Sequence, residues 1–388
     1  MKRISILLVS LFSLQTIQAQ PCKTTEDLVK LPGVLKKNTD PSSMTGSTFK
    51  APEKPAAQKA MDAAAEIVKK NFSVQGGEAH YWAMANDREF FDMYSYPSYQ
   101  LVVAYYQDVC VDGKKTFSSE YTVDFQIRAN PEMMFFDAGP NEKELLQDKA
   151  KYGELPISIF RYLSYPKSWG DKISSGKGMI EDHDGNNYME HKDAYYIYYI
   201  TKGDLPLLLP VSRKELLESL LELYEREKLY RNNTIKWKHD QAVKYMAEYE
   251  KSGNKLMYQS HLENKERLEK ERAELDSLIN IKRGEVEAKL KNESPEWLAK
   301  QATHKFNESR FSRDRVMESA RFKGFYEGPD ANSVYRFNPA VAASKKDRTG
   351  EPLFFRVRHR YKVGETFSKQ INEGFVRNFD FEALRKLL

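Results

Sequence analysis

The chain has few cysteines, few histidines and little excess charge. Its 388 residues include 2 Cys and 7 His, and the formal net charge is +5. So small an excess predicts no dense basic face, which argues against a nucleic-acid partner. Two cysteines permit one intramolecular disulfide, between Cys22 and Cys110, and two free or buried thiols are the equal alternative. Hydrophobic residues make up 40% of the chain, too many for a disordered protein.

The sequence also has no apolar run long enough to cross a membrane, which needs about 20 residues. The apolar stretch ISILLVSLF follows Lys2 and Arg3, and the more polar SLQTIQAQ comes after it. A charged start, a short apolar centre and small residues before a cleavage site are typical of a secretory signal peptide. We therefore expect residues 1–19 to be a signal peptide and the protein to be exported, periplasmic or extracellular. Pro21 before Cys22 does not fit a lipid-anchoring motif, so we expect no lipid.

Local catalytic motifs are lacking as well. The sequence contains no G-x-S-x-G elbow and no H-E-x-x-H pair, and the GKG at 176–178 lacks the spacing of a phosphate loop. These absences do not bear on a catalytic site assembled from distant residues, which leaves no local signature. We therefore expect no cofactor, except that residues 181–193 are a candidate site for calcium.

The composition along the chain predicts an α+β protein, in which an antiparallel sheet with covering helices precedes a long charged helical arm. Residues 20–57 are rich in Pro, Ser, Thr and Lys without an apolar period, which predicts a flexible tether. Residues 58–210 are expected to form the sheet domain and residues 211–301 the arm. Residues 302–388 are expected to form a mixed α/β segment that can return to the sheet.

Alternating apolar and polar residues predict the strands. In YTVDFQIR, Val123, Phe125 and Ile127 share one face, as in a half-buried strand. YQLVVAYY is apolar on both faces and predicts a strand covered on both sides. Asp112-Gly113 is a hairpin signal. Further strand-like stretches are AHYWAMA, DAYYIYYI, SVYRF and PLFFRVRHRYKV.

The arm begins with a helix signal. Ser212 and Glu215 have the spacing of a capping box, and the helical pattern that follows breaks near residues 232–233 and 252–254. Apolar residues of its second half are spaced mainly by threes, fours and sevens: Leu268, Leu275, Leu278, Val286 and Leu290. So narrow a seam indicates a helical hairpin or a short coiled coil, and we favour an arm folded against its own chain.

Residues 181–193, EDHDGNNYMEHKD, resemble a calcium-binding loop. The oxygen ligands that calcium requires recur at a suitable spacing as Asp182, Asp184, Asn186, Glu190 and Asp193. Such a loop lies between two helices, however, whereas a strand-like stretch follows here. The preferred interpretation is therefore a hairpin with its tip at residues 184–187, a strong turn composition. A transition metal bound through the two histidines of this stretch is a third interpretation.

Three arginines alternate along FFRVRHRY. On a strand Arg356, Arg358 and Arg360 point to one face about 6.6 Å apart. Such a row can bind carboxylates, phosphates or sulfates. The alternative, which we prefer, is a strand face balanced by acids on neighbouring elements.

These features together favour a non-catalytic exported binding or scaffold protein over an enzyme. A sheet domain with a long polar arm suits contacts with a protein or envelope partner. One alternative is an exported hydrolase with a non-local active site. Another is a calcium-stabilised extracellular module.

Overall fold

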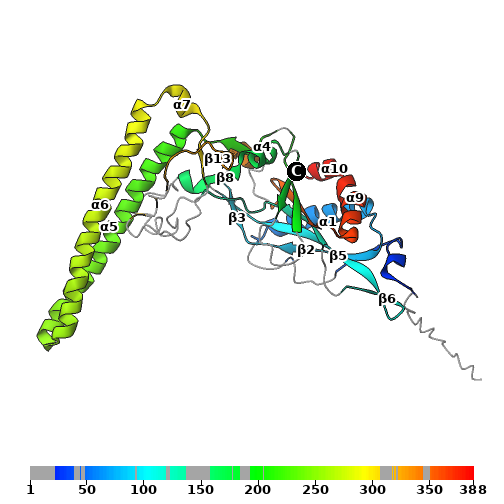
Figure 1. Ribbon diagram of the computed structural model, residues 1–388, viewed down its shortest axis with the longest axis horizontal. Helices are drawn as coiled ribbons and strands as arrows, with labels where there is room; N and C mark the ends of the chain where they lie inside the picture. Colours follow the sequence, from blue (N-terminus) through cyan, green and yellow to red (C-terminus); the bar gives the residue numbers. More distant parts are fainter. Residues whose placement is uncertain are drawn as a thin grey trace, which may run out of the picture.

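The computed structural model has the α+β fold that the sequence predicts. It describes residues 22–38, 44, 49–91, 94–118, 123–136, 158–176, 178–183, 193–203, 205–305, 317, 319, 322–343 and 350–388. In these residues an eight-stranded and a four-stranded sheet form the body, with a small two-stranded sheet of β3 (Glu89–Phe91) and β4 (Tyr94–Tyr96). Two long helices project from one end of the body as a hairpin (Figure 1).

The larger sheet has the strand order β1-β2-β5-β7-β14-β10-β9, with β6 paired to β5. Its strands are β1 (Val34–Lys37), β2 (Gly77–Ala85), β5 (Tyr99–Val111), β6 (Lys114–Phe117), β7 (Val123–Ala129), β9 (Met179–His183), β10 (Asp193–Ile200) and β14 (Phe355–Lys362). β1 is parallel to β2, and the other described pairs are antiparallel. The predicted hairpin turn at Asp112-Gly113 joins β5 to β6, and both residues have positive φ. Because β14 lies between β7 and β10, the chain returns from the arm to this sheet.

One face of the larger sheet is covered by helices. These are α1 (Glu53–Asn71), α9 (Thr366–Gly374) and α10 (Phe381–Arg385) (Figure 1). Successive residues of a strand point to opposite faces, so every second residue meets this helical layer. Phe125 and Ile127 of β7 are fully buried there, as their alternation predicts. The opposite face carries polar residues, and these form the site described below.

The smaller sheet is built around β13 (Asn332–Phe337), which pairs antiparallel with three strands. The three are β8 (Tyr162–Pro166), β11 (Leu208–Pro210) and β12 (Thr303–His304). Helix α4 (Lys167–Ser175) directly follows β8 and contacts strands of both sheets, including β9 and β10 of the larger one. A hydrophobic cluster that contains residues of both sheets includes Tyr165, Ile180, Tyr199, Tyr335 and Phe354. Helix α4 and this cluster therefore hold the smaller sheet beside β9 and β10.

The arm is a hairpin of α5 (Arg213–Ser252) and α6 (Lys255–Asn292), followed by the short α7 (Pro295–Ala299). Helices of 40 and 38 residues are each about 60 Å long at the rise of an α-helix. The predicted capping box of Ser212 and Glu215 starts α5. The predicted break after residue 252 is confirmed, because Gly253 has a left-handed conformation and ends the helix.

The two long helices meet along the predicted apolar seam. Of its five residues, Leu268, Leu275 and Val286 are buried, and Leu278 and Leu290 pack against the same cluster while partly exposed. The predicted break at residues 232–233 is wrong, since α5 continues through them. Ile235, one helical turn later, is buried in the cluster, and this packing outweighs the low helix propensity of asparagine. No helix among the described residues combines the length and the apolar composition needed to cross a bilayer.

Part of the predicted tether is folded. Leu28 is buried, and β1 is hydrogen-bonded to β2. Cys22 and Cys110 form a disulfide, which is one of the two alternatives that the sequence left open. The prediction of a flexible tether was therefore wrong for residues 22–38, and also for residues 53–57, which form the start of α1. No apolar period reveals residues 22–38, because Leu28 is the only buried residue among them. The predicted signal peptide, residues 1–19, lies outside the described residues.

Candidate functional site

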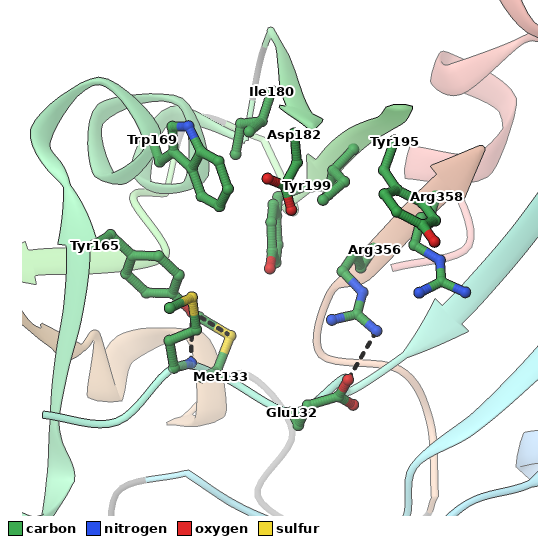
Figure 2. Close-up of a pocket in the computed structure, with 12 residues that line it drawn as sticks. Glu132, Met133, Tyr165, Trp169, Ile180, Asp182, Tyr195, Tyr199, Arg356 and Arg358 are labelled. Atoms are coloured by element: carbon green, nitrogen blue, oxygen red, sulfur yellow. Dashed lines mark hydrogen bonds and ion pairs between the residues drawn. The ribbon is translucent and has the colours of Figure 1, made fainter. Parts of the chain in front are cut away.

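A pocket of about 570 Å³ opens on the face of the larger sheet that the helical layer leaves uncovered (Figure 2). The sheet contributes Asp182, Tyr195, Ile197, Tyr199, Arg356 and Arg358 to its lining. The segment after β7, strand β8 and helix α4 contribute Glu132, Met133, Met134, Tyr165 and Trp169. A cavity of this size lies within the range of small-ligand sites, about 300–1,000 Å³.

Strand alternation and register place the sheet residues of the pocket. Tyr195, Ile197 and Tyr199 occupy every second position of β10 and so share one face. Across the neighbouring strand, Tyr199 lies opposite Arg356. On the other side, Tyr195 lies opposite Asp182 of β9. Three adjacent strands therefore bring aromatic, cationic and acidic side chains together.

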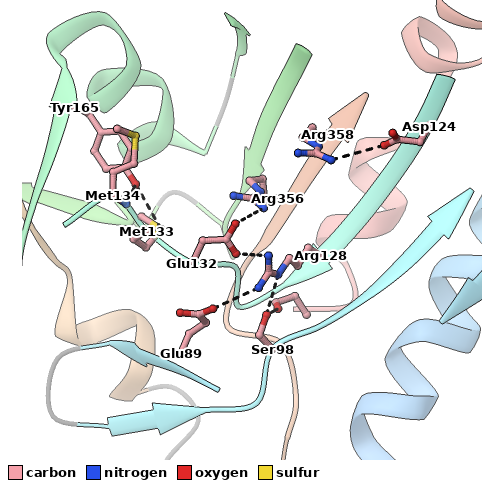
Figure 3. Close-up of polar contacts among 11 residues, drawn as sticks. Glu89, Ser98, Asp124, Arg128, Glu132, Met133, Met134, Tyr165, Arg356 and Arg358 are labelled. Atoms are coloured by element: carbon pink, nitrogen blue, oxygen red, sulfur yellow. Dashed lines mark hydrogen bonds and ion pairs between the residues drawn. The ribbon is translucent and has the colours of Figure 1, made fainter. Parts of the chain in front are cut away.

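Glu132 connects two guanidinium groups at the floor of the pocket (Figure 3). It accepts a hydrogen bond of 3.0 Å from Nη2 of Arg356 and forms an ion pair with Arg128. Arg128 also donates from Nε to Ser98 Oγ at 3.0 Å and pairs with Glu89 at 3.3 Å. Burial acts to raise the pKa of Glu132, but Arg356 and Arg128 outweigh it and the pKa is lowered. Glu132 is therefore charged at neutral pH and holds both arginines in place.

Arg358 is held by an aromatic ring and a buried acid. Its guanidinium lies over the ring of Tyr195, 5.1 Å from the ring centre, and its Nη2 is 3.9 Å from Oδ1 of Asp124. The Nε atoms of Arg358 and Arg356 are buried and have no hydrogen-bond partner among the described residues. A buried donor without a partner costs about 1–3 kcal/mol. Both guanidinium groups also line the pocket, where a ligand that offers acceptor atoms can meet them.

Aromatic residues form the wall opposite the arginines. Tyr165 and Trp169 border the cavity on the side away from Arg356 (Figure 2). The Tyr165 hydroxyl accepts a hydrogen bond of 2.8 Å from the backbone N–H of Met134, which fixes its position. Burial raises the pKa of Tyr165 and of Tyr199, so both hydroxyls stay protonated at neutral pH. The wall therefore offers flat apolar surfaces with neutral hydroxyl groups.

The structure brings two of the three predicted arginines into the pocket. Arg356 and Arg358 line it, and Arg360 on the same strand is not among the lining residues. Arg356 and Arg358 each have an acidic neighbour on another element, as the interpretation of a balanced strand face requires. The pocket lining therefore contains these two positive charges together with the two carboxylates of Glu132 and Asp182.

The candidate calcium loop lies largely outside the described residues. Asp182 and Asp193 are described, and Asp184, Asn186 and Glu190 are not. β9 and β10 pair antiparallel on its two sides, so the flanking elements are strands, unlike the helices that flank a calcium-binding helix–loop–helix unit. This pairing is the one that the hairpin interpretation requires. In the described part of the chain, no three His, Cys, Asp or Glu residues are grouped so that they could hold a metal ion.

Millimolar calcium is expected to leave the melting temperature unchanged relative to a chelator. A ligand that binds only the folded state raises that temperature once its concentration exceeds Kd. Here Asp182 lies on β9, which is paired with β10, and its side chain lines the pocket. Thermal melts in calcium and in chelator check this expectation. A shift of several degrees that the double substitution Asp182→Asn and Asp184→Asn abolishes would contradict the hairpin interpretation.

Sequence patterns did not point to several residues of the pocket. Glu132, Tyr165 and Trp169 stand on three different segments, and Arg128 supports the floor from a fourth element. No local motif connects them, because their proximity depends on how α4 packs against β10. The alternating arginines and the acidic stretch at β9 were the only sequence signals for this site.

Comparisons with protein-family models, with curated proteins and with solved structures found no match for this chain.

Proposed function

We propose that the protein is an exported, non-catalytic binding protein that holds a small saccharide in this pocket. The observation that carries the proposal is the convergence of aromatic rings with charged hydrogen-bonding groups on one cavity. A sugar ring presents an apolar C–H face and a rim of hydroxyl groups. The face suits contact with rings such as Trp169, and hydroxyl groups both donate and accept hydrogen bonds.

The charges of the pocket favour a ligand without net charge. Arg356 and Arg358 are matched by Glu132 and Asp182 among the lining residues, so a phosphate or sulfate would meet both attraction and repulsion. A hydroxyl oxygen can accept from the guanidinium group of either arginine, and the hydroxyl hydrogen remains available for a carboxylate. A polyhydroxylated ligand therefore uses both signs of charge in the pocket.

The pocket is also fixed before any ligand arrives. Glu132 holds the guanidinium of Arg356, Tyr195 stacks on Arg358, and the Met134 amide holds Tyr165. A preformed site loses little side-chain freedom on binding, which strengthens the complex. This rigidity supports recognition as the role of the pocket.

The proposal of export depends on residues 1–19. Their charged start and short apolar run have the form of a signal peptide. The disulfide between Cys22 and Cys110 supports export, because disulfides persist in oxidising compartments such as the periplasm or the extracellular space.

The two carboxylates of the pocket raise hydrolysis as the rival function. A glycosidase that uses two carboxylates needs one of them protonated as the general acid. Glu132 is poorly suited to that role, because Arg356 and Arg128 lower its pKa. Among the described lining residues there is also no histidine, serine or cysteine to act as a base or nucleophile. A hydrolase would therefore have to use Asp182 as its acid, and product analysis separates it from the proposed binding without turnover.

Titration calorimetry with a panel of monosaccharides and disaccharides tests the proposal. Trp169→Ala and Arg358→Ala are expected to weaken binding of the best sugar at least about 10-fold, equivalent to about 1.4 kcal/mol. Trp237→Ala and Arg267→Ala are matched controls, because both side chains are largely exposed on the arm. These two variants should keep the affinity of the wild type.

Two results would contradict the proposal in different ways. If no sugar of the panel binds, or if pocket and arm variants bind equally well, the pocket is not a saccharide site. If the protein releases reducing sugar from a bound glycoside, the site is catalytic and the hydrolase is the correct function. Product analysis by chromatography after long incubation separates the second case from simple binding.

A further inference from the structure

A second pocket, of about 480 Å³, lies where the arm joins the body. Its lining includes the first residues of α4, the first residue of α5, and the chain that leaves α7 for β12. Among the described lining residues, Lys167, Arg213 and Lys300 contribute three positive charges and Glu327 contributes one negative charge. Unlike the first pocket, in which the charges cancel, this one has an excess of positive charge.

Arg213 is the central cation of this pocket. Its side chain is 3% exposed, and its guanidinium lies 4.5 Å from the ring centre of Trp297 and 5.1 Å from that of Phe325. One Nη atom pairs with Glu327, which is largely exposed. The Nε of Arg213 is buried and has no hydrogen-bond partner among the described residues. The two rings fix the guanidinium, so this donor has a defined direction.

Two hydroxyl groups of the pocket are in the same situation. Oγ1 of Thr303 and Oγ of Ser333 are buried without a hydrogen-bond partner among the described residues. Native proteins leave few buried polar atoms without a hydrogen-bond partner, and a bound ligand or water molecule can supply the missing partner. Three unpaired polar atoms on the lining of one positive pocket therefore indicate a polar, acceptor-rich ligand.

The beginning of α4 adds backbone donors. Pro166, Lys167 and Ser168 line the pocket, and no side chain caps this nine-residue helix. The first N–H groups of a helix lack partners within the helix, and the helix dipole places partial positive charge there. An anion at this point gains from these donors as well as from the neighbouring lysines.

We infer that this second pocket binds a tetrahedral oxyanion of the phosphate class, free or as the phosphate group of a larger molecule. Such an ion has enough acceptor atoms for Nε of Arg213, the two hydroxyls and the N-terminus of α4. Its charge offsets that of Lys300, which adds to the positive charge of the lining while Lys167 is paired with Asp171 and Arg213 with Glu327. Because the lining comes from both the body and the arm, the bound ion would link α4 to the first turn of α5 and so stabilise the base of the arm.

Equilibrium dialysis with orthophosphate, at constant ionic strength kept with sodium chloride, tests the inference. One ion is expected to bind per chain. Lys300→Gln should weaken binding at least about 10-fold. Glu327→Gln should strengthen binding, because it removes the acid that the described part of the lining contains. Lys270→Gln is the matched control, since this lysine is highly exposed on the arm and should not affect the result.

The opposite effects of the two pocket variants separate a specific site from general attraction to a basic protein. Equal losses in Lys300→Gln and Lys270→Gln would overturn the inference, as would absence of binding or weaker binding in Glu327→Gln. A parallel titration with O-phosphoserine distinguishes the two sources of the ligand. Binding of both compounds assigns the site to the phosphate group, and binding of orthophosphate alone assigns it to the free ion.

Discussion

Replacing both Cys22 and Cys110 with serine is expected to lower the free energy of unfolding by about 4–5 kcal/mol. The bridge joins residues 88 positions apart, and a cross-link over so long a loop strongly restricts the unfolded chain. It also fixes the start of the folded N-terminal segment to the end of β5. There the Cys22 amide donates to the Gly113 carbonyl at 3.1 Å, and the Cys110 amide donates to Thr25 Oγ1 at 3.2 Å.

Urea unfolding of the wild type with and without reductant, beside the double variant, measures this contribution. Reductant should destabilise the wild type by the same amount as the substitution and should have no effect on the variant. The alternative result is local detachment, because β1 is an edge strand whose one described partner is β2. If only residues 22–38 detach, fast hydrogen exchange would be confined to β1 and β2 while the unfolding midpoint stays unchanged. That outcome would show that the bridge anchors one segment and does not stabilise the whole fold.

The strands of the larger sheet were predictable because one of their faces is buried and the other is not. β7 and β14 alternate clearly, and the turn at Asp112-Gly113 carries its own chemical signal. The order of the strands was not predictable in the same way. The position of β14 between β7 and β10 depends on contacts such as Val357 beside Ile127, which are far apart in the sequence. No local pattern encodes such a pairing.

Two errors of prediction have a common physical origin. The sequence predicted a break at residues 232–233 and a tether over residues 20–57, in both cases from local propensity. In the structure Ile235 is buried in the seam of the arm, and Leu28 is the buried residue of the N-terminal segment 22–38. A single buried side chain and a disulfide are enough to order a segment whose composition is polar. Propensity summed over a short window does not detect either of them.

The candidate site was predictable only where it lies on regular strands. Alternation placed Arg356 and Arg358 on one face, and the acidic stretch drew attention to Asp182. Trp169 and Tyr165 had no such signal, because α4 and β8 belong to the other sheet and reach the pocket through packing. The proposed binding site therefore lies between elements that show no relation in the sequence.

Lowering the pH from 7 to 5 is expected to destabilise the protein by about 2 kcal/mol through His359 alone. This residue directly follows the pocket residue Arg358 on β14, but it points to the opposite, helix-covered face and is fully buried. Burial lowers its pKa from 6.5 to about 4, although Nδ1 lies 3.2 Å from the Asp124 carbonyl oxygen, which favours the charged form. Nε2 has no partner among the described residues, so a second proton would be a buried and unsatisfied donor.

The sign of this effect follows from the direction of the shift. The unfolded chain takes up a proton near pH 6.5, whereas the folded chain resists it until about pH 4, so stability is complete above pH 6.5 and is lost as the pH falls between these values. Glu53 and Glu132, whose pKa values are lowered, lose their contributions only at lower pH. Urea unfolding of wild type and His359→Gln from pH 7 to pH 5 isolates the histidine, because the other groups contribute equally to both proteins. His239→Gln is the control on the arm, because it measures how removal of a partly exposed histidine changes the free energy of unfolding. Parallel pH profiles for wild type and His359→Gln would mean that His359 is solvated or already protonated in the fold, and would contradict its place in the core.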